Sequence, residues 1–238
     1  ALTVMLYTVM SELLKQSQPD AVIVTMPIYL APLSAVMNMH RWNFPVLTVI
    51  TDFTKVHRQW FADGSDLLLV PTQEVFEQAQ KFGFPPERVK ITGIPINPRF
   101  SQQEMEKRSR RSALGWQHDL TTMLIVGSKR VKNLTGVIHL LNHSGLPLQL
   151  AIGAGGDEEL FSRLQAETWH LPVHVYNYVQ NMPELMLAAD CLMSKAGGLI
   201  VSESLACGLP LLLIDVTPGQ EEGNARYVIE RGAGELAS

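Results

Sequence analysis

The feature that most limits the fold is a recurring pattern of short apolar segments whose residues do not alternate with polar ones. These segments are 21–26, 46–51, 66–71 and 89–94 in the first part of the chain, and 122–127, 148–153, 173–178, 191–194 and 209–215 in the second. Segments that are apolar throughout are typical of strands covered on both faces, as in a parallel sheet. The pattern therefore predicts an α/β protein.

The segments between these strands have the length and the end signals of helices. Residues 71–83 begin with Pro-Thr and stop at Gly83, while Pro183 stands at a favourable first helical position of 182–190. Strand–helix alternation with four or more strands on each side predicts two doubly wound units. We place the boundary in the most polar stretch, so that 1–99 and 100–238 form the two domains.

That polar stretch, 97–116, contains Arg108, Arg110 and Arg111 close together. One interpretation is the solvated face of a helix. The alternative is a basic patch that faces anionic lipid or a nucleotide.

Composition excludes some classes of protein. Hydrophobic residues make up 46% of the 238 residues, so a large core can be buried, and the net charge of −4 gives no reason to expect nucleic acid as a partner. Pro27 and Pro32 interrupt the apolar run 21–39, which favours a buried strand, a turn and a buried helix over a transmembrane segment.

The chain opens with a helical segment whose first residue is Ala1, with neither a signal peptide nor a preceding strand. We therefore expect it to begin inside a domain. Cys191 and Cys207 both lie in apolar segments, which indicates buried, reduced thiols in a cytosolic protein.

The main candidate site follows the strand 191–194. In open α/β sheets ligands bind beyond the carboxyl ends of strands. Lys195, Gly197 and Gly198 stand there, directly before a helix, which together predict an anion site. Glu203 lies further along that helix, and its carboxylate can accept two hydrogen bonds from a vicinal diol.

A second polar turn follows the next strand, 209–215. It presents Gln220, Glu221 and Asn224, and amides with carboxylates match sugar hydroxyls, which both donate and accept hydrogen bonds. The two strand ends together predict a site for phosphate, ribose and hexose. The alternative is a plain glycine turn with surface acids.

Further candidates follow other strands. Asp52, His57 and Trp60 come after 46–51, at the expected ligand edge of the first domain. His57 is a weak candidate for a base and otherwise a positioning or structural residue, and Trp60 fits the core somewhat better than a lipid-facing rim. Glycines at 153–156 precede the acids 157–159, which would repel phosphate and instead indicate a helix start.

The segments KAGGLIVSESLACGLPLLLID and PGQEEGNARYVIERGAG resemble the donor-binding region of a glycosyltransferase family. It contains monogalactosyldiacylglycerol synthases and processive diacylglycerol glucosyltransferases, with the lipid II glycosyltransferase as a more distant relative. NMPELMLAADCLMSKAG, TDFTKVHRQWFADGSDLLLVPT and ERVKITGIPINPRF extend the resemblance. It implies the GT-B fold, in which two Rossmann-like domains face a cleft, the first of them incomplete here.

The resemblance also implies roles for individual residues. Glu203 would bind the ribose, Gln220 and Glu221 would face the hexose, and Asn224 would support their loop. The remaining contacts would come from Lys195, from the backbone of Gly197 and Gly198 at the diphosphate, from Tyr178 and Val179 at the uracil, and from Gly127 and Ser128, which remain from the family's glycine-rich loop. Helix dipoles and amides would hold the leaving UDP, without a metal or another cofactor.

This sequence departs from the family pattern at three loops. The glycine-rich loop reads GSKRVKN at 127–133, Leu199-Ile200 replaces Gly-Thr, and Asn177-Tyr178 replaces Gly-Phe. Lys129, Arg130 and Lys132 would either bind phosphate or form a solvent-facing basic turn. The family's histidine base lies upstream of this chain, so we expect a fragment that lacks both ends and is inactive alone.

The resemblance implies an inverting enzyme that transfers galactose or glucose from a UDP-hexose to diacylglycerol, as a cytoplasmic protein at a membrane surface. The histidines show no ligand spacing with cysteines or acids, so we also expect no metal site. Two alternatives remain open: a UDP-sugar epimerase of the same architecture, and an inactive relative that binds nucleotide sugars.

Overall fold

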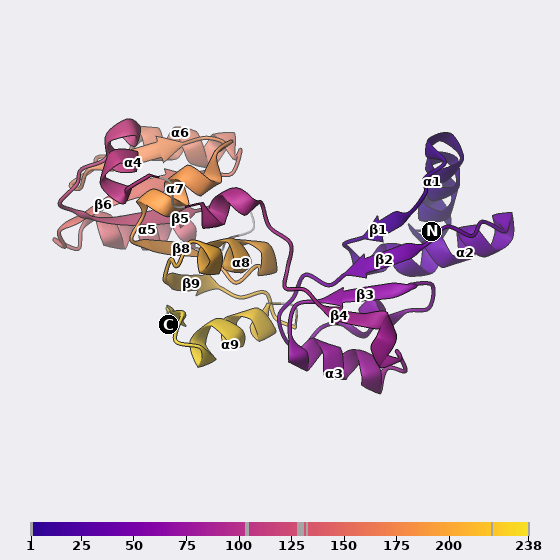
Figure 1. Cartoon of the computed structure of the whole chain (residues 1–238). Coiled ribbons are helices and arrows are strands. Elements are labelled where there is room, and N and C mark those ends of the chain that lie inside the picture. Colours follow the sequence, from indigo (N-terminus) through magenta and orange to yellow (C-terminus); the bar gives the residue numbers. More distant parts are fainter. Residues whose placement is uncertain (1, 103–104, 128–130, 132, 220, 238) are drawn as a thin grey trace. The chain divides into compact units, whose positions relative to one another are not determined.

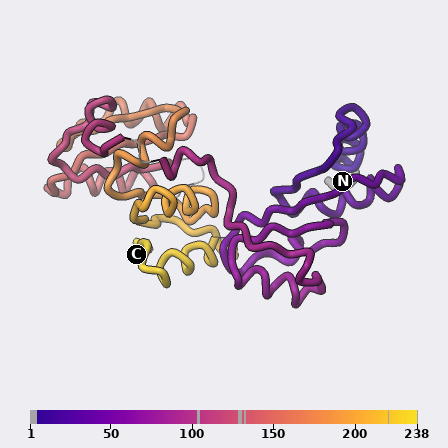
Figure 2. Tube along the Cα trace, viewed as in Figure 1, coloured from indigo at the N-terminus to yellow at the C-terminus, as the bar shows by residue number. Residues whose placement is uncertain are grey.

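The computed structural model describes residues 2–102, 105–127, 131, 133–219 and 221–237. The chain divides into two compact units, residues 1–95 and 96–238 (Figure 2). Each unit contains one parallel sheet with helices, as the apolar segments predict.

The first unit has four parallel strands in the order β1-β2-β3-β4 (Figure 1). Its elements are α1 (Leu2–Ser17), β1 (Val22–Val24), η1 (Pro27–Tyr29), α2 (Leu30–His40), β2 (Val46–Val49), η2 (Arg58–Phe61), β3 (Leu67–Val70), α3 (Gln73–Lys81), η3 (Pro86–Arg88) and β4 (Val89–Ile91). β1 pairs with β2 at Val22↔Val46, so successive strands all end at the same edge. That edge carries the loops after the strands, as expected for a ligand-binding α/β sheet.

The second unit has six parallel strands in the order β10-β9-β8-β5-β6-β7. Its elements are η4 (Pro98–Ser101), α4 (Lys107–Leu114), β5 (Thr121–Val126), α5 (Leu134–Asn142), β6 (Leu148–Gly153), α6 (Glu158–Ala166), β7 (Val173–Tyr176), α7 (Met182–Ala188), β8 (Cys191–Lys195), α8 (Gly198–Ala206), β9 (Leu211–Asp215), α9 (Glu222–Glu230) and β10 (Gly234–Leu236). The chain order reverses between β5 and β8, which are neighbours in the sheet.

Every strand that the apolar segments predict is present. The apolar run 21–39 forms β1, η1 and α2, as expected. No helix in the described part of the chain has the length and apolar character that crossing a membrane requires. The edge strand β10 escaped the sequence analysis because its three residues, GEL, carry no apolar run.

The core of the second unit explains why its strands are apolar on both faces. Ile125 and Ile152 are fully buried and pack with Leu134 and Leu160 from α5 and α6. The neighbouring residue Leu124 is also fully buried although it points to the opposite face. Both sides of the sheet are therefore covered, which fits the absence of polar alternation.

Both sequence interpretations of the arginine cluster are wrong for two of its members. Arg110 and Arg111 are only 5% and 6% exposed. Arg110 forms an ion pair with Glu184 of α7, and Arg111 forms one with Asp190 and donates to the carbonyl oxygen of Ala188 at 2.9 Å. The two guanidinium groups therefore join α4 to both ends of α7, because five fixed donors satisfy several acceptors at once.

Replacing Arg111 by methionine is expected to lower the free energy of unfolding by about 2 kcal/mol, because the buried Ala188 carbonyl loses this donor and Asp190 keeps only Lys107 and the Thr122 N–H. Asp190 is partly exposed and can be rehydrated, which limits the loss. Urea denaturation measures the change. The exposed neighbour gives a matched control, since Arg108→Met should alter stability by less than about 0.5 kcal/mol. Equal effects of the two changes would contradict the structural role of Arg111.

Candidate functional site

The second unit places its polar loops around the point where its strand order reverses. Gly127 follows β5, and Ala196–Gly198 follow the neighbouring strand β8. Open α/β sheets bind ligands in the crevice at such a reversal, beyond the carboxyl ends of the strands. The nine-residue helix α8 begins at Gly198 and directs its positive end to this edge.

Lys195 and Glu221 join the ends of β8 and β9. The Lys195 ammonium forms an ion pair with Glu221 Oε1, and the backbone N–H of Thr217 donates to Glu221 Oε2 at 3.0 Å. Burial alone would raise the pKa of Glu221, but these hydrogen bonds hold that pKa below its usual value. Glu221 is only 3% exposed, so its carboxylate fixes the loop 217–221 against β8.

Asn224 and the glycines lie on the same edge. Asn224 is fully buried, and its amide donates to the carbonyl oxygen of Ala196 at 3.0 Å. That bond orients the peptide just before Gly197, the residue that caps α8 with extended backbone. Gly198 is buried as the first residue of the helix. The start of α9 thus holds the turn from which α8 begins.

Glu203 lies on α8 two residues after the first turn. Its side chain is half buried, and burial raises the pKa of Glu203 to about 7. Among the described residues no hydrogen bond or ion pair involving its carboxylate is present. Such a carboxylate gains free energy when a ligand hydroxyl donates to it.

Gly127 needs to be a glycine for packing. A Cβ there would lie 2.5 Å from Leu134 Cδ2 and 3.2 Å from the carbonyl oxygen of Gly153. The Gly127 N–H donates to that same carbonyl at 2.8 Å, so β5 and β6 continue to pair beyond the end of β5. Packing against Leu134 and Gly153 is therefore one reason for a glycine at position 127, apart from any contact with a ligand.

Gly127→Ala is expected to lower the free energy of unfolding by about 1–3 kcal/mol, because the added methyl group overpacks a buried site. Gly197→Ala is the matched comparison. A Cβ at Gly197 would meet its nearest neighbour, Ile200 Cγ2, at 3.6 Å, an ordinary contact. Chemical denaturation should separate the two variants, and an equally stable Gly127→Ala protein would show that the methyl group is accommodated.

Tyr178 and Val179 follow β7 at the far end of the same edge. Tyr178 is 72% exposed, and Val179 is partly buried beside Gly153. Two buried side-chain oxygens, Asn177 Oδ1 and Asn181 Oδ1, have no hydrogen-bond donor among the described residues. The end of β7 therefore combines the exposed Tyr178 ring with two unsatisfied acceptor oxygens. Nothing in the sequence indicated that these two asparagine side chains would lack a donor.

The loop after β6 is the start of a helix, as its acids predict. Asp157 caps α6 by accepting the Leu160 N–H at 3.2 Å, and Glu158 and Glu159 stand in the first turn. Ser128 and Gln220, predicted to bind the donor, lie outside the described residues, as do Lys129, Arg130 and Lys132. Leu199, which replaces a glycine of the family pattern, is 52% exposed in the first turn of α8.

In the first unit, Asp52, His57 and Trp60 follow β2 as expected, but their environments differ. Trp60 is 3% exposed, so it belongs to the core, and Asp52 is partly buried. His57 is exposed, and its Nδ1 accepts the Gln59 N–H at 3.3 Å. That bond caps η2 through the ring of His57, and the roles of this histidine as a base or as a positioning residue stay predictions.

No group of three or more histidine, cysteine or acidic residues in the described ranges has the arrangement of a metal site. Both cysteines are free, and each is partly buried, less than expected from the apolar segments around them. The Lys195–Glu221 pair is the main feature that sequence reasoning missed, because both residues look like ligand contacts when each is considered alone.

Two family models match the chain. The model for monogalactosyldiacylglycerol (MGDG) synthase matches residues 1–96, and the glycosyltransferase family 28 C-terminal domain matches residues 121–238. Monogalactosyldiacylglycerol synthase 3 of Arabidopsis thaliana is 32% identical over 231 residues, which cover 93% of this chain and 50% of that protein. Monogalactosyldiacylglycerol synthase 2 of the same plant is 34% identical over 196 residues, 79% of this chain and 42% of that protein. The chain thus spans about half the length of the curated relatives it matches.

Solved structures with low sequence identity share the fold. MurG of Acinetobacter baumannii is 17% identical with a TM-score of 0.62, covering 95% of this chain and 62% of that one. The UDP co-structure of MnaA from S. aureus is 16% identical with a TM-score of 0.72, covering 98% of this chain and 67% of that one. These likenesses, with the two parallel sheets, confirm the predicted GT-B class of two Rossmann-like units.

Proposed function

Because this chain belongs to the monogalactosyldiacylglycerol synthase family of glycosyltransferases, we propose that the protein transfers a hexose from a UDP-sugar to diacylglycerol. Galactose is the first candidate, since the similar relatives carry that sugar in their names, and glucose is the second. The acceptor would be reached at the cytoplasmic surface of a membrane by a peripheral protein.

The observation that carries the proposal is the presence of three features at one edge of the second sheet, with a fourth further along the helix that starts there. The three are the start of α8, the ion pair of Lys195 with Glu221, and the amide of Asn224 on the Ala196 carbonyl, and the fourth is the unpartnered, half-buried Glu203 on α8. An anion, a diol and a hexose require a positive helix end, a free carboxylate and a fixed polar loop, respectively. Each of these is present.

In the proposed reaction the acceptor hydroxyl gives its proton to a general base and attacks the anomeric carbon from the side opposite UDP, so the configuration inverts. The bond between that carbon and the diphosphate oxygen breaks, and negative charge develops on UDP. The N–H groups that begin α8 would stabilise this charge without a metal ion. Glu221 is paired with Lys195, so we assign it to holding the loop at the hexose, and direct contact with the sugar would fall mainly to Gln220.

The activity is tested with the full-length protein and vesicles that contain diacylglycerol. Radiolabelled UDP-galactose and UDP-glucose are supplied in turn, and label in the lipid extract is the expected result. An epimerised nucleotide sugar without labelled lipid would contradict transfer and support the epimerase alternative. The chain is also similar to UDP-GlcNAc 2-epimerase of Neisseria meningitidis, but that likeness concerns the fold alone.

Donor binding is tested separately on this chain by calorimetry. We expect saturable binding of UDP, weakened in the Glu203→Gln variant. Absence of heat at about 1 mM UDP would indicate an affinity too weak for a substrate site and would contradict the proposed donor site. The second alternative, an inactive relative that binds nucleotide sugars, predicts UDP binding together with unlabelled lipid.

A further inference from the structure

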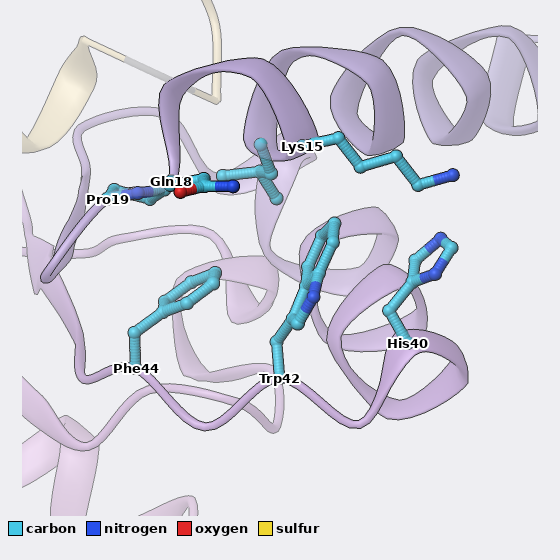
Figure 3. Close-up of a pocket in the computed structure, with 7 residues that line it drawn as sticks. Lys15, Gln18, Pro19, His40, Trp42 and Phe44 are labelled. Carbon is cyan, nitrogen blue, oxygen red and sulfur yellow. The ribbon is translucent and has the colours of Figure 1, made fainter.

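A cavity of about 500 Å³ lies in the first unit, and none of its lining residues belongs to the candidate donor or acceptor sites. It is lined by Lys15, Gln18 and Pro19 at the end of α1, and by His40, Trp42 and Phe44 at and beyond the end of α2. Its volume falls within the range of small-molecule sites, roughly 300–1,000 Å³. Figure 3 shows Trp42 and Phe44 extending from one segment toward α1, with Lys15 reaching from α1 to the side of His40.

The cavity and the acceptor-side residues lie at opposite edges of the sheet. Gln18 and Pro19 precede β1, and Trp42 and Phe44 precede β2, so the cavity is at the amino ends of these strands. His57 follows β2 at its carboxyl end. A molecule in the cavity would therefore occupy a second site and would not compete directly with the acceptor.

The aromatic wall of the cavity is held in place by local contacts. The rings of His40 and Trp42 are stacked with centroids 4.6 Å apart, and the Trp42 and Phe44 centroids are 6.2 Å apart. Ser11 Oγ and His40 Nε2 are hydrogen-bonded at 2.8 Å, and the backbone N–H of Trp42 donates to the Met37 carbonyl at 3.0 Å. A ring that enters the cavity meets a prearranged stacking surface, so little conformational entropy is lost on binding.

The charges at the cavity favour an anion. No acidic side chain lines it, and Lys15 has no ion-pair partner among the residues that the structure describes. The carboxyl ends of α1 and α2 disfavour an anion, because each carries about half a negative charge, but that effect is confined to the last turn of a helix. Lys15 carries a full charge on a flexible stem that extends past the helix end, so an anionic group can meet it in the open part of the cavity.

We propose that this cavity binds a small organic anion with a planar ring. The ring lies against Trp42 and Phe44, and the anionic group pairs with the Lys15 ammonium. The same chemistry is offered by an aromatic carboxylate and by a nucleoside monophosphate, and the two sources are distinguished by experiment. The site is independent of the proposed transfer reaction, because none of its residues belongs to the donor or acceptor edges.

The test compares three ligands that share one naphthalene ring and are negative, neutral and positive, respectively. Naphthoate, naphthalenemethanol and naphthylmethylammonium are titrated into the full chain by calorimetry, and naphthoate is expected to bind most tightly. Lys15→Gln should weaken naphthoate about two- to fivefold, the size of an exposed ion pair, and leave the alcohol unchanged. Lys81→Gln is the matched control, an exposed lysine in the last turn of α3 in the same unit, and should change nothing.

The ring contact is tested with Trp42→Phe and Trp42→Leu, and circular dichroism checks that both variants fold. Loss of a stacking platform is expected to weaken all ring ligands in the leucine variant, and phenylalanine should restore part of the affinity. Adenosine monophosphate in place of naphthoate shows which anionic source is preferred. The proposal is overturned if the anionic, neutral and cationic naphthalene ligands bind equally, if the ammonium binds best, if neither naphthoate nor adenosine monophosphate binds at about 1 mM, or if Lys15→Gln leaves naphthoate binding unchanged.

Discussion

Replacing Glu203 by glutamine is expected to weaken UDP binding by about ten- to a hundredfold and, at the same time, to raise the melting temperature of the unliganded protein. The affinity falls because a carboxylate accepts hydrogen bonds from the ribose diol more strongly than an amide, and an amide offers one acceptor in place of two. Hydrogen bonds to a charged group contribute about 1.5–3 kcal/mol each, which corresponds to the stated loss. Calorimetry with UDP measures it.

The gain in stability follows from the pKa of Glu203. Burial raises this pKa to about 7, whereas the unfolded chain has the ordinary value of 4.5. Between these values the folded state binds more protons than the unfolded state, so stability falls as pH rises through this window and the full penalty is present above it. Glutamine carries no charge and removes the penalty.

The stability gain of Glu203→Gln should have a defined size and a defined dependence on pH. The side chain is half exposed and solvent screens it, so we expect a gain of about 1 kcal/mol, or roughly 2–4 °C, near pH 8. The gain should vanish below the ordinary pKa of 4.5. Glu235→Gln, at an exposed position of β10, is the control and should change neither property. A Glu203→Gln protein that loses both affinity and stability would indicate a structural role instead.

Replacing Lys195 by methionine is expected to lower the free energy of unfolding by about 3–5 kcal/mol, the largest stability effect that we predict. Glu221 would keep the Thr217 N–H but lose its cation while only 3% exposed, and an unpaired buried carboxylate is strongly destabilising. Thermal and urea denaturation measure the loss. We also expect weaker UDP-sugar binding, because the loop 217–221 loses its attachment to β8.

The sign of the pH dependence should differ between the two proteins. In the unmodified chain the pKa of Glu221 is held below its usual value, so its stabilising contribution is present above the unfolded pKa and is lost as pH falls through the folded pKa. Without Lys195, burial dominates and raises that pKa, so the variant should recover stability on acidification. The double variant Lys195→Met/Glu221→Met should regain most of the loss, because two apolar side chains leave no buried charge.

A surface ion pair provides the comparison. Arg226 and Glu230 of α9 are 3.8 Å apart and about half exposed, so Arg226→Met should cost less than about 1 kcal/mol. If Lys195→Met were equally mild, Glu221 would have to be solvated, and its assignment as the anchor of the loop would be wrong.

The sequence alone determined the fold class and the edge at which we place the candidate site. Strands covered on both faces are apolar throughout, and this signal is local, so each of the long strands could be located without a structure. Parallel strands end at one edge, so polar residues directly after a strand, such as Lys195 and Glu221, could be assigned to the ligand side before any coordinates were known.

Only the tertiary structure decided which polar residues pair with each other. Arg110 and Arg111 lie in the most polar stretch of the chain, yet they are buried because Glu184 and Asp190, more than seventy residues away, reach them. In the same way the structure assigns Glu221 to Lys195 and leaves Glu203 without a partner among the described residues. Ion pairing and burial depend on contacts between distant segments, and neither residue type nor spacing along one strand carries that information.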